Sequence, residues 1–273
     1  MNTTKTMHSL FYLYGLVPSK ELETKPLESL VGIDNHHEIF TFKIAEVTAL
    51  ICEIDENEFS EQKIEEKVKN DMKWLEEKAF HHHETINQLH QHYTVIPLKF
   101  CTIYKTIDNL TDVIEQEKER LQAVFQKVAR KEEWNIKIFC EEEALRKEVA
   151  EQSSIIKEQE AALQTLTPGR QFFEKKKLQK LMDEEVIMLK RSKCESIHDQ
   201  LKNLSAQAEI KKNWTQDMTG KKQDMNWNAV YLISTEGREE FTSRLEEMQQ
   251  SYKNAGFTIE WSGPWPCYHF ANL

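Results

Sequence analysis

The stretch Gly263-Pro264-Trp265-Pro266-Cys267-Tyr268-His269-Phe270 lies at the C-terminal end and restricts the fold more than any other segment. Its two prolines lack a backbone N–H and fix φ, so the stretch cannot continue a helix or a central strand. Its aromatic rings are stabilised when they are buried away from water. Chain ends are ordered when they are tied down, so we expect a tail, residues 263–273, that lies in an apolar groove of its own chain or of a partner. The residues expected to make this contact are Trp265, Pro266, Tyr268 and Phe270.

The bulk properties describe a water-soluble chain that is large enough for two hydrophobic cores. It has 273 residues, of which 39% are hydrophobic and 30% are charged, and one core seldom serves a chain of this length. The formal net charge of −10 opposes attraction to nucleic-acid phosphates and to anionic lipid. We therefore expect two domains, no nucleic-acid partner and no membrane partner.

The five cysteines are odd in number and contain no Cys-x-x-Cys pair, which indicates free thiols in a reducing compartment. Cys52, Cys101 and Cys140 each lie in an apolar run, so we expect them to be small buried side chains. The residues Met1–Lys5 lack the pattern of a signal peptide, and no apolar stretch approaches transmembrane length. These features predict a cytoplasmic protein.

The first half of the chain alternates short apolar strands with amphipathic helices. Strands are predicted at 10–17, at 40–44 and 47–52 as a hairpin turned at Ala45-Glu46, at 93–100 and at 134–140. Pro97 indicates a sheet edge or a strand end. A helical stripe runs from Ser60 to His90, and a second helix is expected to begin at a cap, Asp108 or Thr111. This order predicts an α+β domain with a mainly antiparallel sheet, similar to an elaborated ferredoxin-like pattern.

The second half has longer and more highly charged helices. Residues 141–166 are expected to form a linker helix, which Pro168-Gly169 separates from a long helix. A loop is predicted at 211–226, a central strand at 229–233, a helix at 241–252 and a last strand at 257–261. The expected organisation is an N-terminal α+β domain, 1–141, a C-terminal α+β domain, 142–262, and the tail, 263–273.

The histidines invite interpretation as a metal site, because His81-His82-His83-Glu84 is a dense cluster with His90 nearby. A zincin needs His-Glu-x-x-His, in which the two ligands share one helix face, but Asn87 stands at the second ligand position. His83 and His90 lie on or beside the apolar stripe, where neutral histidine is common. We expect no metal site, and a metal-dependent hydrolase that uses His83, Glu84 and His90 is the alternative.

Other motifs that carry chemistry do not occur in the sequence, which has no nucleophile elbow and no phosphate-binding glycine loop. The acidic pair Glu132-Glu133 is expected to be a solvated face. The same holds for Lys175-Lys176-Lys177, although this run could instead dock an acidic partner. Trp214 and Trp227 flank the polar loop and favour an interaction surface. We expect no catalytic residue and no cofactor.

Several segments form an ordered set that spans nearly the whole chain. They are Tyr12-Leu13-Tyr14-Gly15, Trp74 with Ala79 and His83-Glu84, Pro97-Leu98-Lys99-Phe100-Cys101-Thr102, Glu133-Trp134 with Ile136 and Ile138, Pro168-Gly169-Arg170, Ala229-Val230-Tyr231-Leu232, and the stretch 263–270. Each segment is weak alone, and the ordered set resembles the GvpL/GvpF family of gas vesicle proteins. Two positions depart from the family pattern, because Cys101 stands where glycine is usual and Cys267 where proline is usual.

The resemblance implies an accessory or minor structural protein that takes part in the assembly of the hollow gas vesicle shell, without enzymatic activity. It implies two α+β domains, ferredoxin-like and modified ferredoxin-like, with long helices in the second and a tail that folds back. It also implies association with the hydrophobic shell subunit and with other gas vesicle accessory proteins, in the cytoplasm and at the gas vesicle. A general helical adaptor or chaperone is a further alternative.

Overall fold

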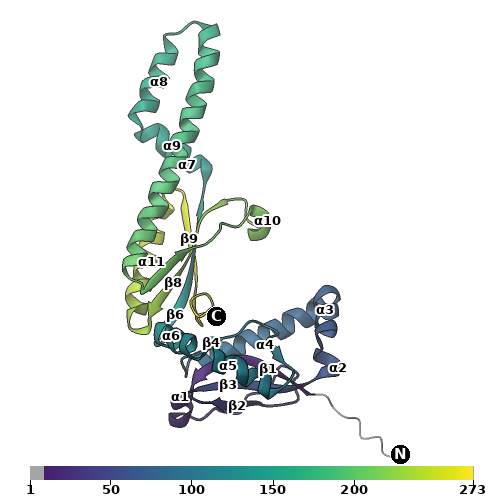
Figure 1. The fold of residues 1–273 in the computed structure, drawn as a ribbon. Coiled ribbons are helices and arrows are strands. Elements are labelled where there is room, and N and C mark those ends of the chain that lie inside the picture. Colours follow the sequence, from purple (N-terminus) through teal and green to yellow (C-terminus); the bar gives the residue numbers. More distant parts are fainter. Residues whose placement is uncertain (1–8, 273) are drawn as a thin grey trace, which may run out of the picture. The chain divides into compact units, whose positions relative to one another are not determined.

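The computed structural model describes residues 9–272, which form two compact units (Figure 1). Unit 1 contains the described residues of Met1–Glu133 and of Pro264–Leu273, and unit 2 is Trp134–Gly263. Both units combine a β-sheet with helices, which confirms the α+β class. Met1–Lys5, to which the expectation about a signal peptide refers, lie outside the described residues. Over residues 9–272, none of the helices has the length and apolar character that a membrane crossing needs.

Unit 1 is built on a five-stranded sheet with the order β2-β3-β1-β4, in which β5 also pairs with β1. The pairs β1–β3, β1–β4, β1–β5 and β2–β3 are antiparallel. The elements that precede β6 are β1 (Ser9–Pro18), α1 (Ser19–Thr24), β2 (Ile39–Ile44), β3 (Val47–Asp55), α2 (Glu56–Phe59), α3 (Glu61–Asn70), α4 (Met72–His90), β4 (Ile96–Pro97), β5 (Ile103–Tyr104), α5 (Ile107–Gln116) and α6 (Lys118–Val128).

The strands of unit 1 follow the predicted hairpin and the predicted edge. The β2–β3 hairpin turns at Ala45-Glu46, where Ala45 takes a φ of 54°. Pro97 lies in β4 at the end of the strand order, and β4 is far shorter than the predicted strand 93–100. Gly15 of β1 pairs with Pro97, and a Cβ at Gly15 would lie 3.0 Å from the Ile96 carbonyl oxygen, so this close approach favours glycine.

The predicted helical stripe from Ser60 to His90 is wrong in one respect, because it is broken into α3 and α4 at Asp71. Asp71 leaves helical geometry at φ −129° and ψ 80°. Its Oδ1 accepts a hydrogen bond from the backbone N–H of Trp74 at 3.0 Å. The apolar spacing alone predicts one continuous helix, but Asp71 caps a new helix and so interrupts it.

The start of α5 also differs from the prediction. Thr106, rather than Asp108 or Thr111, is the N-cap, because its Oγ1 accepts the backbone N–H of Asn109 at 3.1 Å. Thr106 has extended backbone geometry, as an N-cap residue requires, whereas Asp108 already lies in the first helical turn. An acidic side chain in that turn is favourable for the helix dipole, and this explains why it resembles a cap in the sequence.

Unit 2 contains a four-stranded sheet with the order β7-β8-β6-β9. Its β8 and β9 are connected through α11 and lie on either side of β6. The elements are β6 (Lys131–Cys140), which begins in unit 1, α7 (Glu142–Gln152), α8 (Ser154–Gln164), α9 (Pro168–Asn203), β7 (Gln207–Ile210), α10 (Gln216–Thr219), β8 (Asp224–Ser234), the 3₁₀ turn η1 (Thr235–Gly237), α11 (Arg238–Lys253) and β9 (Phe257–Trp265), which ends in unit 1. The short α10 lies within the segment that was predicted to be a loop.

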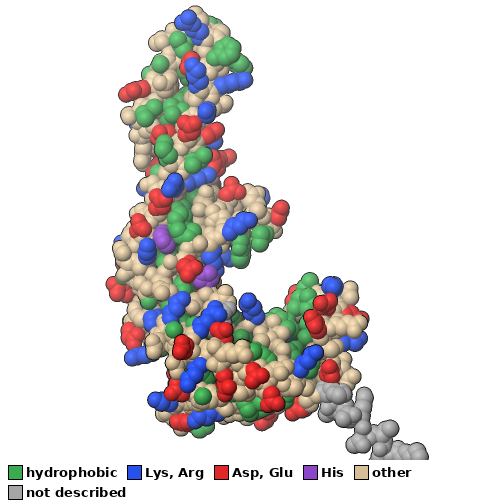
Figure 2. Space-filling model, in the orientation of Figure 1, with side chains coloured by type: hydrophobic (Ala, Val, Ile, Leu, Met, Phe, Trp, Pro, Cys, Tyr) green, Lys and Arg blue, Asp and Glu red, His purple; other side chains and the backbone are tan. Residues whose placement is uncertain are grey.

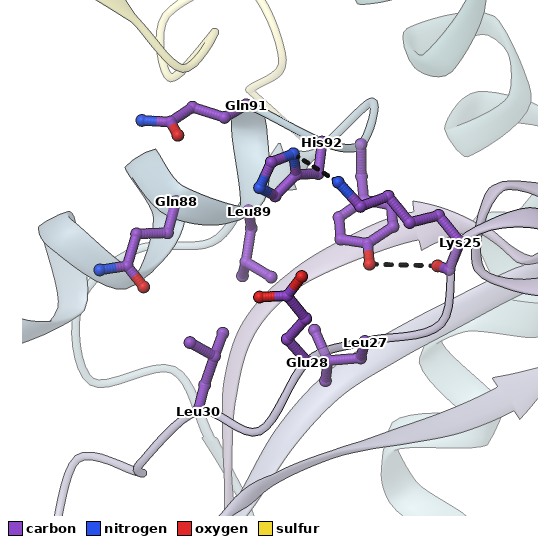
Figure 3. A pocket seen from close by; sticks show the side chains of 9 residues that line it. Lys25, Leu27, Glu28, Leu30, Gln88, Leu89, Gln91 and His92 are labelled. Atoms are coloured by element: carbon purple, nitrogen blue, oxygen red, sulfur yellow. Dashed lines mark hydrogen bonds between the residues drawn. The ribbon is translucent and has the colours of Figure 1, made fainter.

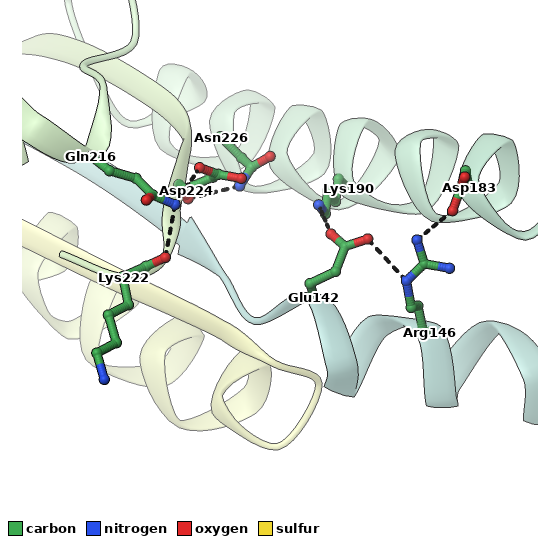
Figure 4. Close-up of polar contacts among 8 residues, drawn as sticks. All are labelled: Glu142, Arg146, Asp183, Lys190, Gln216, Lys222, Asp224 and Asn226. Atoms are coloured by element: carbon green, nitrogen blue, oxygen red, sulfur yellow. Dashed lines mark hydrogen bonds and ion pairs between the residues drawn. The ribbon is translucent and has the colours of Figure 1, made fainter.

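The segment 141–166 is not a linker helix but two helices that pack against α9. Leu145, Val149 and Ile156 are buried and belong to the same core as the central strands. These buried residues anchor the segment to the core, whereas Ile155 is 49% exposed. On the outside, Glu142 contacts both Lys190 and Arg146, and Arg146 contacts Asp183, which joins α7 to α9 through a network of charges (Figure 4).

Candidate functional site

The tail lies in unit 1 with its apolar side chains largely out of water. Pro266, Cys267 and Phe270 are buried, and Trp265 and Tyr268 are half-buried. Strand β9 continues to Trp265, so Pro264 is part of a strand, and β9 is the last strand of its sheet order, where proline is tolerated. Beyond it the chain turns, because the Cys267 carbonyl accepts the backbone N–H of Ala271 at 2.8 Å.

One side of the tail is held by the start of β6. Glu133 Oε2 accepts a hydrogen bond from the backbone N–H of His269 at 2.7 Å. The Cys267 thiol donates to the Lys131 carbonyl at 3.5 Å, and burial raises the pKa of this thiol to about 12, so it stays protonated. The prediction that Glu132-Glu133 is a solvated face is therefore wrong, since both residues are buried and one of them binds the tail.

The other side of the tail meets α4 at His83. The imidazole of His83 lies 5.1 Å from the Trp265 ring and 6.0 Å from the Tyr268 ring, between ring centroids, with a stacked arrangement in the second pair. Asn87 Nδ2 lies 3.2 Å from His83 Nε2, and Tyr268 Oη lies 3.5 Å from His83 Nδ1. Aromatic stacking and a neighbouring amide thus fix this histidine between the helix and the tail.

His82 is the buried member of the histidine cluster. The Tyr12 hydroxyl donates to its Nδ1 at 2.7 Å, and its Nε2–H donates to the Leu98 carbonyl at 3.1 Å. Burial lowers the pKa of His82 to about 4, against an opposing effect of the Leu98 carbonyl. A neutral His82 satisfies both contacts, so its role in this arrangement is to join β1, α4 and the segment that follows β4.

His81 is half-buried and meets the fully buried Tyr14. The Tyr14 hydroxyl lies 3.2 Å from His81 Nε2, and the Tyr14 ring stacks on His82 with 5.6 Å between centroids. Burial lowers the pKa of His81, and the charge of Lys78 acts in the same direction. Each of the three neighbouring histidines therefore has aromatic partners: Tyr14 for His81, Tyr12 and Tyr14 for His82, and Trp265 and Tyr268 for His83.

Cys101 has a backbone conformation that favours glycine. Its φ is 63°, in the left-handed region, and its backbone N–H donates to the Tyr12 hydroxyl oxygen at 3.2 Å. Its side chain is half-buried, so the prediction of a buried thiol is wrong here, whereas it is confirmed for Cys52 and Cys140. The family pattern has glycine at position 101, and the left-handed backbone at Cys101 favours glycine for the same reason.

The same unit has a shallow hollow of about 180 Å³ beside the end of α4 (Figure 3). Leu27, Leu30 and Leu89 supply apolar lining. Lys25 Nζ lies 2.8 Å from His92 Nδ1, and the Tyr93 hydroxyl donates to the Lys25 carbonyl at 3.1 Å. Lys25, His92 and Tyr93 thus bond to one another at one side of the hollow, and Glu28, Gln88 and Gln91 supply the other polar lining.

The structure does not gather the residues of the alternative metal site. Glu84 lies 3.4 Å from the Asn87 amide, and His83 faces the tail. Among residues 9–272, no group of three or more His, Cys, Asp or Glu side chains is placed to hold a metal ion. Trp227, expected at an interaction surface, packs instead against the core beside His198, with 5.3 Å between the ring centroids, whereas Trp214 is 40% exposed.

Two residues of this arrangement escape reasoning from residue types alone. Glu133, which binds the tail, occurs in a polar run that is typical of a solvated surface, and Asn87, which contacts His83, belongs to no motif. The sequence signal that could have identified Glu133 is the family resemblance, because Glu133-Trp134 and the stretch 263–270 both belong to the segments that carry it. Segments that are far apart in the sequence but are shared by one family are candidates for contact in the fold.

Comparison with known proteins assigns the family. The family model for "Gas vesicle synthesis protein GvpL/GvpF" matches residues 10–272. Gas vesicle protein F of Dolichospermum flosaquae is 24% identical over 267 residues, which cover 96% of this chain and 97% of that protein. Gas vesicle protein F1 of Halobacterium salinarum is 21% identical over 262 residues, which cover 96% and 92%.

A solved structure has the same fold. The crystal structure of the gas vesicle protein GvpF from Anabaena sp. PCC7120 superimposes with a TM-score of 0.71 at 21% identity, and the match covers 97% of this chain and 99% of that one. This likeness extends over both α+β units. The chain belongs to the GvpL/GvpF family of gas vesicle synthesis proteins.

Proposed function

We propose that this chain is an assembly accessory or minor structural protein of gas vesicles that binds the hydrophobic shell subunit. The observation that carries the proposal is the family match over residues 10–272. A subunit that builds the wall of a gas-filled space must present an apolar face, and a free subunit would aggregate through that face. The proposed task is to cover this face reversibly, in the cytoplasm and at the growing vesicle, together with other gas vesicle accessory proteins.

Exposed apolar side chains of unit 1 support binding by apolar burial. Phe80 and Met72 on α4 are exposed by 67% and 64%, and Phe40 on the edge strand β2 by 39%. Large apolar side chains on one helix are costly unless a partner covers them. The start of β2 is covered by backbone, because Ile39 N–H donates to the Leu30 carbonyl at 2.8 Å. Strand β2 is the first of its sheet order, so a partner strand can add along the rest of its outer edge.

The test is co-purification of the full chain with the shell subunit at increasing salt. Screening at about 1 M salt shortens the Debye length to about 3 Å, which weakens charge attraction and leaves apolar burial intact. We expect the complex to persist at high salt. Complete loss of the complex on salt addition would contradict binding by apolar burial.

For the tail we propose an intramolecular latch made by Trp265, Pro266, Tyr268 and Phe270. The contacts with His83 and Glu133, on either side of the tail, support this role. Lys127 Nζ also lies 5.4 Å from the centre of the Phe270 ring. A tail that served instead as a docking peptide would be expendable for stability and required for partner binding.

We also propose that the two units are variants of the ferredoxin-like fold and that the chain acts by binding, without catalysis. In unit 2, β8 and β9 are connected through α11 and separated by β6, which is the arrangement of a split βαβ unit. The engagement of His81, His82 and His83 with aromatic partners supports a structural use of the histidines.

A further inference from the structure

The end of the helical hairpin in unit 2 is basic, although the whole chain has a net charge of −10. We name α8 and residues 168–185 of α9 the arm, and residues 165–180 its tip. The tip has one acidic residue, Glu174, and five basic residues, which are Arg170, Lys175, Lys176, Lys177 and Lys180. Figure 2 shows basic and hydrophobic side chains next to one another at this end of unit 2. A local excess of positive charge on an acidic chain favours an acidic partner at this place.

The turn between the helices of the arm is held in one conformation. Gln171 Nε2 donates to the Leu163 carbonyl at 3.1 Å and to the Leu166 carbonyl at 3.0 Å. These carbonyls lie at the end of α8, where no further helical turn follows to donate N–H groups to them. Pro168 begins α9 with a preset φ. The surface between the helices therefore exists before any partner arrives, which reduces the entropy cost of binding.

Two adjoining hollows line this surface between α8 and α9. The first, of about 300 Å³, has Leu163, Leu166 and Phe173 as apolar lining and Arg170 at its rim. The second, of about 400 Å³, has Leu178 and Leu181 as apolar lining, with Lys177, Lys180 and Glu184 at its rim. Lys177 Nζ lies 2.7 Å from Glu174 and Lys180 Nζ lies 3.7 Å from Glu184, and these exposed pairs leave both cations within reach of a partner. Both hollows include Gln159 and Glu174, so they form one groove along the arm.

The two phenylalanines at the tip differ in their relation to the groove. Phe173 lines the first hollow and is 67% exposed. Phe172 is 58% exposed but lies outside the lining of both hollows, with Lys176 Nζ 4.9 Å from its ring centre. An apolar side chain that lines a groove and still faces water is a candidate anchor for a partner.

We propose that the groove between α8 and α9 binds an acidic amphipathic helix of a partner protein. Phe173 and Leu181 are eight residues apart on α9, which corresponds to about 12 Å at about 1.5 Å per residue. A helix with apolar residues seven or eight positions apart fills both hollows, and its acidic side chains meet Arg170 and Lys180. This proposal does not depend on the binding of the shell subunit, which is assigned to apolar surface of unit 1.

A protein helix fits these observations better than a lipid surface or a second copy. A membrane would engage Phe172 and Phe173 alike and needs no groove, and the net charge of −10 opposes an anionic bilayer. A second copy would bring its own basic tip if the contact were symmetric, and like charges would repel.

The test uses the full chain and a fluorescent designed peptide with leucine at its a and d heptad positions and glutamate elsewhere. We expect binding that weakens at least about tenfold when Arg170→Glu and Lys180→Glu are combined, since both change the sign of rim charges. The matched control combines Lys212→Glu and Lys222→Glu, which alter the net charge equally at exposed sites outside the groove and should change the Kd less than about twofold. Phe173→Ala should weaken binding about tenfold and Phe172→Ala less than about twofold.

The substituted residues are exposed, so circular dichroism and thermal unfolding should confirm that each variant is folded. Equal losses of peptide affinity in the groove double variant and the control double variant would contradict binding in the groove. Equal losses in Phe173→Ala and Phe172→Ala would contradict it as well. Binding to phosphatidylserine vesicles in place of the peptide would assign the tip to membranes. Self-association that the Arg170 and Lys180 variants abolish, measured by sedimentation, would assign it to a second copy.

Discussion

Glu133 Oε2 accepts a hydrogen bond of 2.7 Å from the backbone N–H of His269, which joins residues 136 positions apart in the sequence. Glu133 is buried, so its carboxylate has lost water and depends on protein donors. A backbone donor in the tail is satisfied at the same time. This bond fixes where the polypeptide lies after β9 and places Trp265 and Tyr268 against His83.

Replacement of Glu133 by alanine should lower the free energy of unfolding of the chain by about 2 kcal/mol, because a buried donor loses a charged acceptor. Glu133→Gln should cost less, since its amide oxygen can still accept from His269. Urea unfolding of both variants measures the difference. Glu115→Ala, at an exposed glutamate of α5, is the control and should be nearly neutral. Equal stability of Glu133→Ala and the control would show that the bond contributes nothing.

Phe270→Ala should destabilise the chain by about 3 kcal/mol, because the removed ring is almost fully buried and leaves a cavity. Tyr268→Phe should cost less than about 0.5 kcal/mol, since the distance of 3.5 Å between Tyr268 Oη and His83 Nδ1 is at the limit of a hydrogen bond. Thermal unfolding of the full-length variants checks both values. If Phe270→Ala unfolded like the parent chain but no longer bound the shell subunit, the tail would be a docking peptide.

Acidification should destabilise unit 1 through His82. Its folded pKa of about 4 lies below the ordinary value of 6.5, so between these values the unfolded chain binds a proton that the folded chain does not. This contribution is fully present above about pH 6.5 and is lost as the pH falls toward about 4, by up to about 3 kcal/mol at about 1.4 kcal/mol per pH unit. Urea unfolding at several pH values measures it.

The control for this pH dependence is His82→Gln, which removes the titrating group. The variant should be less stable at pH 7 but show a flatter decline in stability between pH 6.5 and 4. His81, whose pKa burial also lowers, leaves a residual slope of the same sign. A slope in His82→Gln as steep as in the parent chain would exclude His82 as its source.

Cys101→Gly should raise the stability of the chain by about 0.5 to 1 kcal/mol. A side chain at a φ of 63° costs roughly 1–2 kcal/mol, which exceeds the roughly 0.5–1 kcal/mol that glycine loses through a more flexible unfolded chain. Cys101→Ala keeps the Cβ and should retain the strain. Chemical denaturation distinguishes the two, and equal values for glycine and alanine would show that the left-handed backbone is not the cause.

The sequence predicts most elements because their signals are local. Residues 10–17 and 229–233 are dense in apolar side chains, and both are core strands. Side chains that compete with periodicity explain the errors: Asp71 interrupts an apolar stripe by capping, and Thr106 takes the cap expected at Asp108. These preferences differ by about 1 kcal/mol, which pattern reading does not resolve.

The site was harder to predict because its contacts are not local. The tail residues could be named from their composition, but their partners could not, since His83 and Glu133 are made into neighbours only by the fold of unit 1. Glu133 in particular has the charge of a surface residue, and the distant His269 supplies one of the donors that accompany its burial.

The most direct test of the central claim, that this chain covers the apolar face of the shell subunit, is light scattering as the shell subunit is diluted from denaturant. With the full chain present in equal amount we expect scattering to be suppressed, and the double variant Met72→Asp with Phe80→Asp should lose this effect. Gln88→Asp, at another exposed position of α4, should retain it. If the shell subunit aggregated equally with and without the chain, the account would be contradicted.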